Sequence, residues 1–490
     1  MALNLIRNSR VFFSTAVDAT TGVNNTAKLN TDTFEIQVLD GLSFSQNTNS
    51  ETVTLNEAGG NPVRGQRSFN TALAPVDFSF STYMRPSKGS TTIDAEESVL
   101  WNALLGSTAI GTAGTITATT ASAAYSETTG VLTITGTGIN ASSLAVGDDI
   151  ILAGFAGATA GGLEYINAPG RVTTISDTGA GITVSLNNPS DTAITGITMT
   201  ATDIKFYKSA WAPVATTYSV VSSHGSNTNN LQKFGLVVLI DKVAYTINNC
   251  TLNQATIDFG LDGIATVAWT GQATEMKQIS TDLTATTGAF AGAGITGTYK
   301  AKVTTAKYLT NKLSTVTLKA VNALKDSAGT TKVTAGKEYA VALTGGNITI
   351  NNNITYITPS NLGTVNLPIA YFTGTRAISG SLNAYLKTGT LTGTITAGTG
   401  KLLQDMLDVA SVEIAPMFAL AINIGGSSTT ATRIEVEMPT AVLTIPTVNT
   451  EQVVSTVINF TAQSASGNVG TRGFDLEQTN EITLRYFTTA

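Results

Sequence analysis

A pattern of alternating apolar residues near the middle of this chain recurs near its C-terminus. Residues 243–272 align with residues 434–463 without a gap. Apolar side chains coincide at every second position: Val243, Tyr245 and Ile247 match Ile434, Val436 and Met438, while Val267 and Trp269 match Ile458 and Phe460. This period of two predicts half-buried β-strands. Two copies of one β unit in one chain are typical of proteins that build a symmetric object from repeated parts.

Three further blocks recur in the same order, which argues against a chance match. The strand pattern at 76–84 matches 378–386, and the pattern at 233–240 matches 417–424. Between these strands each copy has a short helical pattern, with a capping-box signature at Asp94 and Glu97 in the first copy. We therefore predict a mainly β chain with two tandem antiparallel β-sandwich or barrel folds, each with a short flanking helix.

The composition agrees with a β-dominated chain that has many turns. Only 12% of the 490 residues are charged, and 46 are glycine. The net charge of −6 argues against a nucleic-acid-binding face, which must be basic, but suits a surface that nucleic acid slides past. The first residues lack the long apolar region of a signal peptide, and no apolar run approaches the ~20 residues that span a membrane. We expect the chain to be made and used in the cytosol or in a particle assembled there.

The sequence has no arrangement of residues typical of an enzyme. Cys250 and His224 are the single cysteine and the single histidine, which excludes an internal disulfide, a cysteine zinc site and a histidine-rich metal site. We expect Cys250 to be a small buried residue in a strand and His224 to lie in an exposed loop. The glycine pattern of residues 292–297 fits the dinucleotide fingerprint, but a strand pattern follows where a helix is required. We predict no enzymatic activity, no cofactor and no metal.

An insertion at residues 107–205 interrupts the first copy and has no counterpart in the second. It is rich in Thr, Ala and Gly, with short strand patterns separated by turn signals about every ten residues. Because insertions are tolerated at exposed loops, we predict a small β domain that projects outward. The predicted organisation is a first fold at 1–106 and 206–285, the inserted domain at 107–205, a linker at 286–304, a second fold at 305–465 and a C-terminal arm at 466–490.

Two segments carry a resemblance to a known family. Residues 34–86, which begin FEIQVLDGLSFSQNTNS, and residues 248–274, NNCTLNQATIDFGLDGIATVAWTGQAT, resemble bacteriophage tail tube proteins. The resemblance implies a small antiparallel β-sandwich or barrel flanked by one helix. It also implies subunits that form rings, in which the inner strands make a continuous barrel around a lumen. The rings stack into a tube through which genomic DNA is delivered into the host.

The resemblance further implies a location, partners and a ring size. The chain is expected in the tail of the virion, assembled in the host cytoplasm, with itself, tail terminator and baseplate or tip proteins as partners, a sheath protein if the tail contracts, and no membrane. Many family members carry one fold per chain and form hexameric rings, whereas some long-tailed phages carry two and form pseudo-hexameric rings of three chains. We therefore expect a homotrimeric ring, whose closure removes every unpaired strand edge.

Candidate contact residues follow from this assignment. In the family the long hairpin loop at 55–67 reaches the adjacent ring, so the candidates for inter-ring contacts are Glu57, Arg64 and Arg67. The lumen wall should be acidic or neutral so that DNA slides past it. The lumen-lining candidates are Asp77, Asp258 and Asp262 from the first copy and Glu435, Glu437 and Glu451 from the second.

Two other functions suit a β-rich chain. The main alternative is a phage surface or receptor-binding protein, such as an adhesin or fibre built of Thr-rich sandwiches, although fibre repeats rarely carry a helix between strand pairs. A glycan-processing enzyme would need a cleft with paired acids. The adjacent acids of this chain, such as Asp148 and Asp149, would point to opposite faces of a strand and could not act as such a pair.

Overall fold

We describe the protein from a computed structural model of the 490-residue chain. The structure describes residues 9–15, 33–53, 66–88, 93–105, 114–116, 120–137, 144–146, 148–158, 162–176, 181–186, 193–199, 204–207, 211–213, 218–221, 231–240, 243–280, 305–362, 365–388, 397–412, 416–426, 432–450, 453–463 and 481–488. Most of these residues lie in strands, which form one large sheet, a separate seven-stranded sheet and three two-stranded sheets. The predicted mainly β fold is confirmed.

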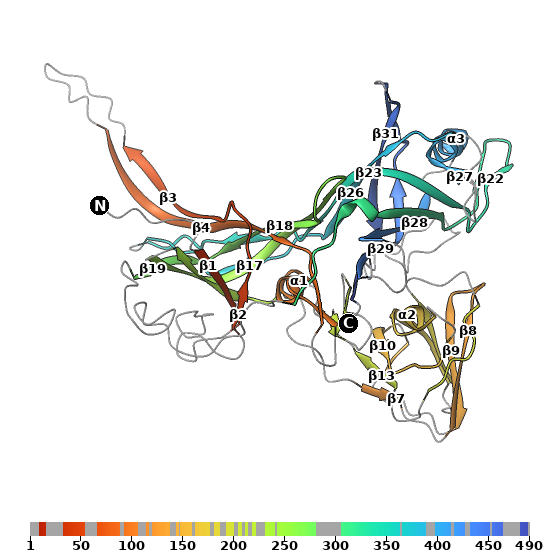
Figure 1. Cartoon of the computed structure of the whole chain (residues 1–490). Helices are drawn as coiled ribbons and strands as arrows, with labels where there is room; N and C mark the ends of the chain where they lie inside the picture. Colours follow the sequence, from red (N-terminus) through yellow and green to blue (C-terminus); the bar gives the residue numbers. More distant parts are fainter. Residues whose placement is uncertain are drawn as a thin grey trace, which may run out of the picture.

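The first copy of the fold is built from two stretches of chain on either side of the insertion. Its elements are β1 (Ser9–Ser14), β2 (Thr33–Ile36), β3 (Ser43–Val53), β4 (Arg67–Tyr83), β5 (Pro86–Lys88), β6 (Ile93–Ala95), α1 (Ser98–Leu105), β14 (Trp211–Pro213), β15 (Tyr218–Val221), β16 (Phe234–Ile240), β17 (Val243–Gly260), β18 (Thr266–Ala273) and β19 (Glu275–Ser280). β3 and β4 rise from it as a long hairpin arm (Figure 1).

The second copy follows in one stretch. Its elements are the 3₁₀-helix η4 (Asn311–Leu313), β20 (Thr315–Ala320), β21 (Leu324–Lys325), β22 (Thr331–Val333), β23 (Glu338–Asn351), β24 (Thr355–Ile357), β25 (Ala370–Phe372), β26 (Ala377–Tyr385), β27 (Ala397–Gly398), α3 (Thr399–Val409), β28 (Met417–Ile424), β29 (Arg433–Leu443), β30 (Thr447–Asn449), β31 (Ser455–Gln463) and β32 (Thr483–Phe487).

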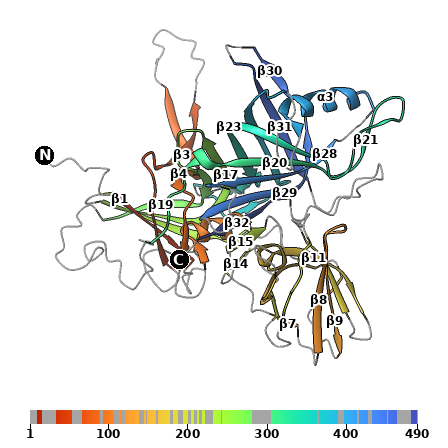
Figure 2. The same cartoon turned by 45° about the vertical axis from the view of Figure 1, so that its right-hand side comes forward.

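The inserted segment forms a sheet of its own. Its strands are β7 (Gly114–Ile116), β8 (Thr120–Ser126), β9 (Val131–Thr137), β10 (Asp149–Ala153), β11 (Pro169–Ile175), β12 (Gly181–Leu186) and β13 (Ile204–Tyr207), with the short helix α2 (Leu163–Ile166). A separate core that includes Leu132, Ile150 and Phe206 holds it together. The sheet lies apart from the two tandem copies (Figure 2). It includes β13, so it extends two residues beyond the predicted end at 205.

The two copies have the same strand topology. In the first, neighbouring strands follow the order β1, β16, β17, β18, β4 and β3, and in the second the order β20, β28, β29, β31, β26 and β23. Even an irregularity recurs: the register shifts between Phe234 and Leu236 of β16 and between the matching Phe418 and Leu420 of β28. The predicted duplication is confirmed and extends to β1 and β20, which the sequence comparison did not match.

A phenylalanine and a glycine exchange places between the copies. Phe78 of β4 lies opposite Gly271 of β18, whereas Gly380 of β26 lies opposite Phe460 of β31. In each pair the phenylalanine ring fills the space above the glycine, and a Cβ atom on either glycine would overlap that ring. The exchange therefore keeps the core volume at this position nearly constant.

The structure corrects the gap-free alignment of the repeat. Trp269 of β18 lies opposite Phe80, and the residue in the same place in the second copy is Ile458, which lies opposite Leu382. Phe460, which the alignment matched to Trp269, instead takes the place of Gly271. The cause is the turn before this strand: seven residues separate the paired residues 258 and 266, but only five separate 449 and 455. The alignment is wrong beyond this turn by two residues.

Helix α1 begins later than the capping-box signature predicts. Asp94 lies in β6, where its carboxylate accepts a hydrogen bond from the Ala95 N–H at 2.8 Å. Glu97 is buried just before the helix and accepts a hydrogen bond from the Tyr486 hydroxyl at 2.6 Å. The capping-box prediction is therefore wrong, because contacts outside the helix occupy both carboxylates.

Candidate functional site

Eight strands form one ladder that runs through both copies. Their order is β3, β4, β18, β17, β23, β26, β31 and β30, and all neighbours are antiparallel. We call these strands the continuous sheet. The junction between the copies is the pair β17–β23, where seven residue pairs run from Gln254 opposite Asn351 to Gly260 opposite Gly345 (Figure 1). The two folds are thus joined side by side through backbone hydrogen bonds.

One face of the continuous sheet is apolar and covered. Every second residue points into a shared core, where its members include Phe80, Trp269, Ile257, Ile348, Leu382 and Ile458. The same core contains residues of β16, α1, β28 and α3, so a second layer covers this face in both copies. Burial of each large side chain contributes roughly 1.5–3 kcal/mol of stability, which holds the sheet to that layer.

The opposite face is polar and almost uncharged. Its side chains include Ser43, Ser45, Ser79, Thr270, Gln272, Gln254, Thr256, Asn347, Thr349, Ser379, Asn383, Asn459 and Thr461, which are exposed or half-buried. Neighbouring strands are linked on this face by side-chain hydrogen bonds. The Ser43 and Ser79 hydroxyls lie 2.8 Å apart, and the Gln272 amide donates to the Asp77 carboxylate at 3.0 Å.

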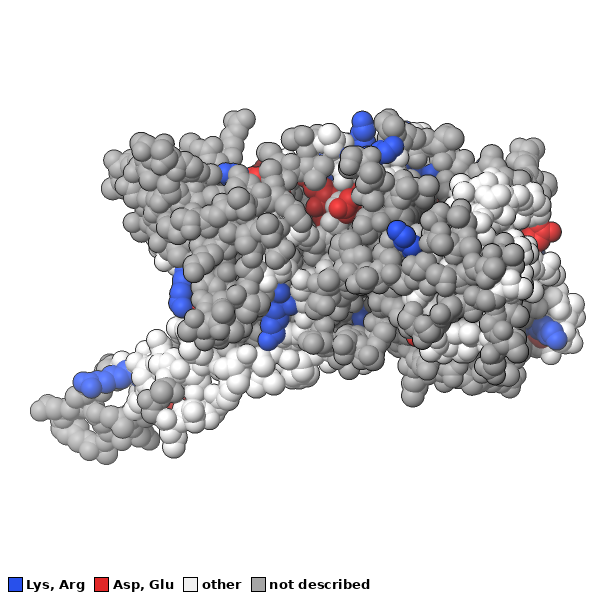
Figure 3. All heavy atoms as spheres, turned by 90° about the horizontal axis from the view of Figure 1, so that it is seen from below, with Lys and Arg blue, Asp and Glu red and all other residues white. Residues whose placement is uncertain are grey.

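The charge on this face is limited to two carboxylates. Asp77 and Asp258 are both exposed there. The strand segments contain no Lys, Arg or Glu at residues 43–46, 76–83, 254–260, 266–273, 345–351, 377–385, 447–449 and 455–463. Figure 3 shows the chain from below, a side on which the Lys and Arg side chains of the described residues are scattered. Outside the β3–β4 arm, which carries Glu51 and Arg67, these segments therefore present hydroxyls, amides and two acids, with no cation to bind phosphate.

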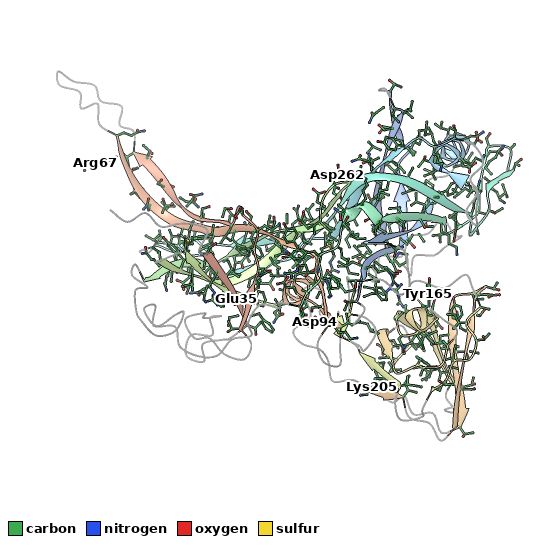
Figure 4. The ribbon with its side chains drawn as sticks, in the orientation of Figure 1. Glu35, Arg67, Asp94, Tyr165, Lys205 and Asp262 are labelled. Atoms are coloured by element: carbon green, nitrogen blue, oxygen red, sulfur yellow. The ribbon has the colours of Figure 1, made fainter. Side chains whose placement is uncertain are left out.

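The predicted lumen-lining residues lie in three different places. Asp77 and Asp258 share the polar face of the continuous sheet. Asp262 lies in the turn after β17 (Figure 4), where it is exposed and 3.8 Å from the Lys312 ammonium group. Glu451 lies outside the described residues.

The prediction that Glu435 and Glu437 lie on a solvated polar face is wrong. The first half of β29 belongs to the covering layer, between β28 and β32. The Arg485 guanidinium of β32 donates to Glu437 at 2.5 Å and lies 2.8 Å from Glu435, which also accepts from Arg433 at 3.0 Å. The Glu437 side chain is only 7% exposed. A carboxylate buried in an ion-pair cluster cannot form part of a lumen wall.

The last strand joins the two copies a second time. β32 pairs with β29 of the second copy and with β15 of the first. Its Tyr486 hydroxyl donates to Glu97 and accepts from the indole N–H of Trp101 at 2.8 Å, and Trp101 contacts the ring of Trp269. Burial raises the pKa of the Glu97 carboxyl to about 7, although the Tyr486 hydrogen bond lowers it. These contacts make the C-terminal strand part of both folds.

The hairpins that follow β3 and β23 differ between the copies. The described part of the β3–β4 arm is exposed, and Arg67 lies where that part ends (Figure 4). Glu57 and Arg64 lie outside the described residues. After β23, by contrast, the chain folds back over the first copy: the Tyr356 hydroxyl donates to the Asn249 carbonyl oxygen at 2.7 Å, and the Leu73 N–H donates to the Asn366 carbonyl oxygen at 2.9 Å. Among the described residues, one such arm therefore protrudes from each chain.

The described residues offer no site for a metal ion. None of the described His, Cys, Asp and Glu side chains form a group of three or more that could hold one. Cys250 is fully buried in β17, and burial raises the pKa of its thiol. His224 lies outside the described residues. None of the described helices is both long enough and apolar enough to cross a membrane.

Comparison with known proteins agrees with this architecture. The chain is similar to tail tube protein pb6 of Escherichia phage T5, with 26% identity over 493 residues that cover 97% of this chain and 75% of the relative. No protein-family model matches the chain. The similarity confirms the predicted resemblance to phage tail tube proteins and supports a structural role in a phage tail.

Proposed function

We propose that three copies of this chain close into a ring of six tube folds, and that such rings stack into a tail tube that delivers DNA. The observation that carries the proposal is the β17–β23 junction, which joins one copy of the fold to the next through seven antiparallel pairs. A heterologous contact repeated from chain to chain forms a ring if its rotation closes. Six folds from three chains correspond to the hexameric rings that single-fold members of the resembled family form.

The polar face of the continuous sheet is proposed to line the lumen. The opposite face already carries a second layer of strands and helices. If the sheet closed with that layer inside, the layer would fill the channel. Closure with the polar face inside leaves an open lumen, walled by hydroxyls, amides, Asp77 and Asp258. Because this wall has no cations in the segments that form it, DNA phosphates find no counter-charge and the genome can slide.

The two kinds of protruding segment are proposed to act outside the lumen. The β3–β4 arm, with Arg67 and the loop that contains Glu57 and Arg64, is proposed to contact the adjacent ring. A ring of three chains then has three arms. The sheet of residues 114–207 is proposed to decorate the outer wall, because it has its own core and lies apart from the continuous sheet. Tail terminator and baseplate or tip proteins would cap the tube in the virion.

Electron microscopy of the purified chain tests this function. We expect hollow tubes or rings. Monomers or trimeric spikes would instead favour the alternative, a receptor-binding adhesin or fibre. The outcome separates the two because a fibre has no reason to enclose a channel wide enough for duplex DNA.

A further inference from the structure

The continuous sheet ends in two strand edges that are free in the single chain. Among the described residues, β3 pairs only with β4, and β30 pairs only with β31. A free edge presents unpaired backbone N–H and C=O groups and is a template for another strand. If the chain forms rings as proposed above, these two edges face each other in neighbouring chains. The internal junction shows how they can meet.

β30 occupies the place in the second copy that the end of β17 occupies in the first. Ile257 lies opposite Val267, two residues before Trp269. Val448 lies opposite Thr456, two residues before Ile458. Since Trp269 and Ile458 hold the same position in the two copies, Val448 holds the position of Ile257.

β3 occupies the place in the first copy that the end of β23 occupies in the second. Ile348 lies opposite Gly380, and Phe44 lies opposite Phe78. Phe78 of β4 and Gly380 of β26 occupy the same position in the two copies of the fold. Phe44 therefore holds the position of Ile348, and in the internal junction Ile348 lies directly opposite Ile257.

We propose that β30 of one chain pairs antiparallel with β3 of the next chain, with Val448 opposite Phe44, and that this pairing closes the ring. The same register places Thr447 opposite Ser45 and Asn449 opposite Ser43. The inference rests on the proposed function and specifies its interface. The partner is a second copy of this chain.

The chemistry of the two edges supports this register independently of the repeat. Ser43 and Ser45 lie on the polar face, opposite Ser79 and Asp77 of β4. Thr447 and Asn449 lie opposite Val457 and Ser455 of β31. These two residues are two and four positions from Asn459, so Thr447 and Asn449 point to the same polar face of the sheet as Asn459. Polar side chains thus meet polar side chains across the proposed junction.

The apolar residues of the two edges also meet. Val448 is 42% exposed in the single chain although it points to the apolar face, and Phe44 is only half-buried. Pairing the two strands covers both side chains. The pairing of β30 with β31 fixes the face to which Val448 points. A slip by one residue would therefore set Val448 opposite Ser43 or Ser45, whose side chains point to the polar face, and would leave Val448 and Phe44 without an apolar neighbour across the junction. Pro446 lacks an N–H, so the ladder between chains is shorter than the seven pairs of the internal junction.

Engineered cysteines test the register in assembled tubes. Residues directly opposite each other on antiparallel strands are close enough for a disulfide. The double variant Ser45→Cys/Thr447→Cys should, after oxidation, give a ladder on a non-reducing denaturing gel that ends at three chains. The matched control Thr256→Cys/Thr349→Cys places the pair within one chain and should stay at one chain. Gln46→Cys/Thr447→Cys points the two thiols to opposite faces and should not crosslink.

The outcomes distinguish this inference from the function on which it rests. Crosslinking of Ser43→Cys/Thr447→Cys in place of Ser45→Cys/Thr447→Cys, in tubes of normal appearance, would overturn the register and leave the tail tube function standing. A ladder that continues to six chains would support the register and contradict the ring of three. If the unmodified chain forms no rings in the microscope, both the function and the inference fail.

A second measurement covers the case in which the cysteine variants do not assemble. Amide hydrogen exchange of the unmodified chain can be compared between assembled tubes and dispersed subunits. We expect at least tenfold slower exchange in residues 43–46 and 447–449 on assembly, because new ladder bonds protect their amides. Residues 345–351 of the internal junction should change little. Unchanged exchange at both edges would overturn the proposed pairing.

Discussion

The hydroxyl groups of Thr256 and Thr349 lie 3.2 Å apart across the junction between the two copies. Thr256 is on β17 and Thr349 on β23, directly opposite each other in the ladder. Their hydrogen bond lies on the nearly uncharged face of the continuous sheet. The pair thus combines the two properties on which our account depends: a sheet that passes from fold to fold, and a face that offers DNA no positive charge.

Positive charge on the polar face should slow DNA passage. Asp77→Lys/Asp258→Lys changes two exposed residues, so folding and tube assembly should be preserved. Each lysine can neutralise a phosphate, and we expect ejection slowed by on the order of tenfold at low salt, with the effect declining as salt rises. Ejection kinetics from infecting particles measure this. Glu127→Lys, which makes half of this charge change in the inserted domain, is the control. Normal kinetics in tubes that carry both lysines would remove these residues from the lumen wall.

Charge reversal on the arm should stop ring stacking. In Arg64→Glu/Arg67→Glu the contacts to the adjacent ring become repulsive, so single rings should form but not lengthen. Sedimentation and microscopy distinguish rings from tubes. Lys205→Glu, a single charge reversal in the inserted sheet, is the control and should give tubes of ordinary length. If the arm variant also gives such tubes, the arm does not stack rings.

The exchanged phenylalanine and glycine should behave as coupled pairs. Gly271→Phe alone overfills the core against Phe78, and Phe78→Gly alone leaves a cavity, so each should lower the free energy of unfolding by several kcal/mol, about 3 for the cavity. The double variant reproduces the arrangement of Gly380 and Phe460. We expect it to recover at least about 1 kcal/mol relative to the sum of the single variants. Denaturant unfolding measures this, and strict additivity would show that the exchange is not compensatory.

Stability should fall as the pH rises through the pKa of Glu97. The folded carboxyl holds its proton up to a pKa of about 7, whereas the unfolded one loses it near 4.5. Acid therefore favours the folded state: the contribution is fully present below pH 4.5 and is lost as the pH rises through 7, by up to roughly 3 kcal/mol. Glu97→Gln keeps the acceptor for Tyr486 and should flatten this dependence. An equally steep fall in the variant would assign the titration to another group.

The strands of the continuous sheet could be predicted from the sequence because one of their faces is buried and the other is polar. That alternation marks residues 76–84 and 378–386 directly, and it places Asp77 and Asp258 on the polar side. The sequence comparison did not match β23 with β2 and β3. In the second copy the single strand β23 pairs with both β20 and β26, whereas in the first copy β2 pairs with β1 and β3 pairs with β4, so no gap-free alignment exists.

The predictions for Glu437 and Glu97 were wrong for a different reason, which is contact between distant parts of the chain. Glu437 alternates with apolar residues and is indistinguishable by pattern from an exposed acid. Arg485, its partner, is 48 residues away and reaches it only because β32 pairs with β29. Likewise, Glu97 has the spacing of a capping residue, but Tyr486 of the last strand occupies its carboxylate. Local patterns carry no information about such partners.

A cryo-electron microscopy reconstruction of the assembled tube tests the central claim most directly. We expect rings of three chains with sixfold pseudosymmetry, β30 of each chain beside β3 of the next, and Asp77 and Asp258 facing the channel. Rings of six chains with twelve folds around the lumen, or a wall in which β3 and β30 remain unpaired, would contradict it.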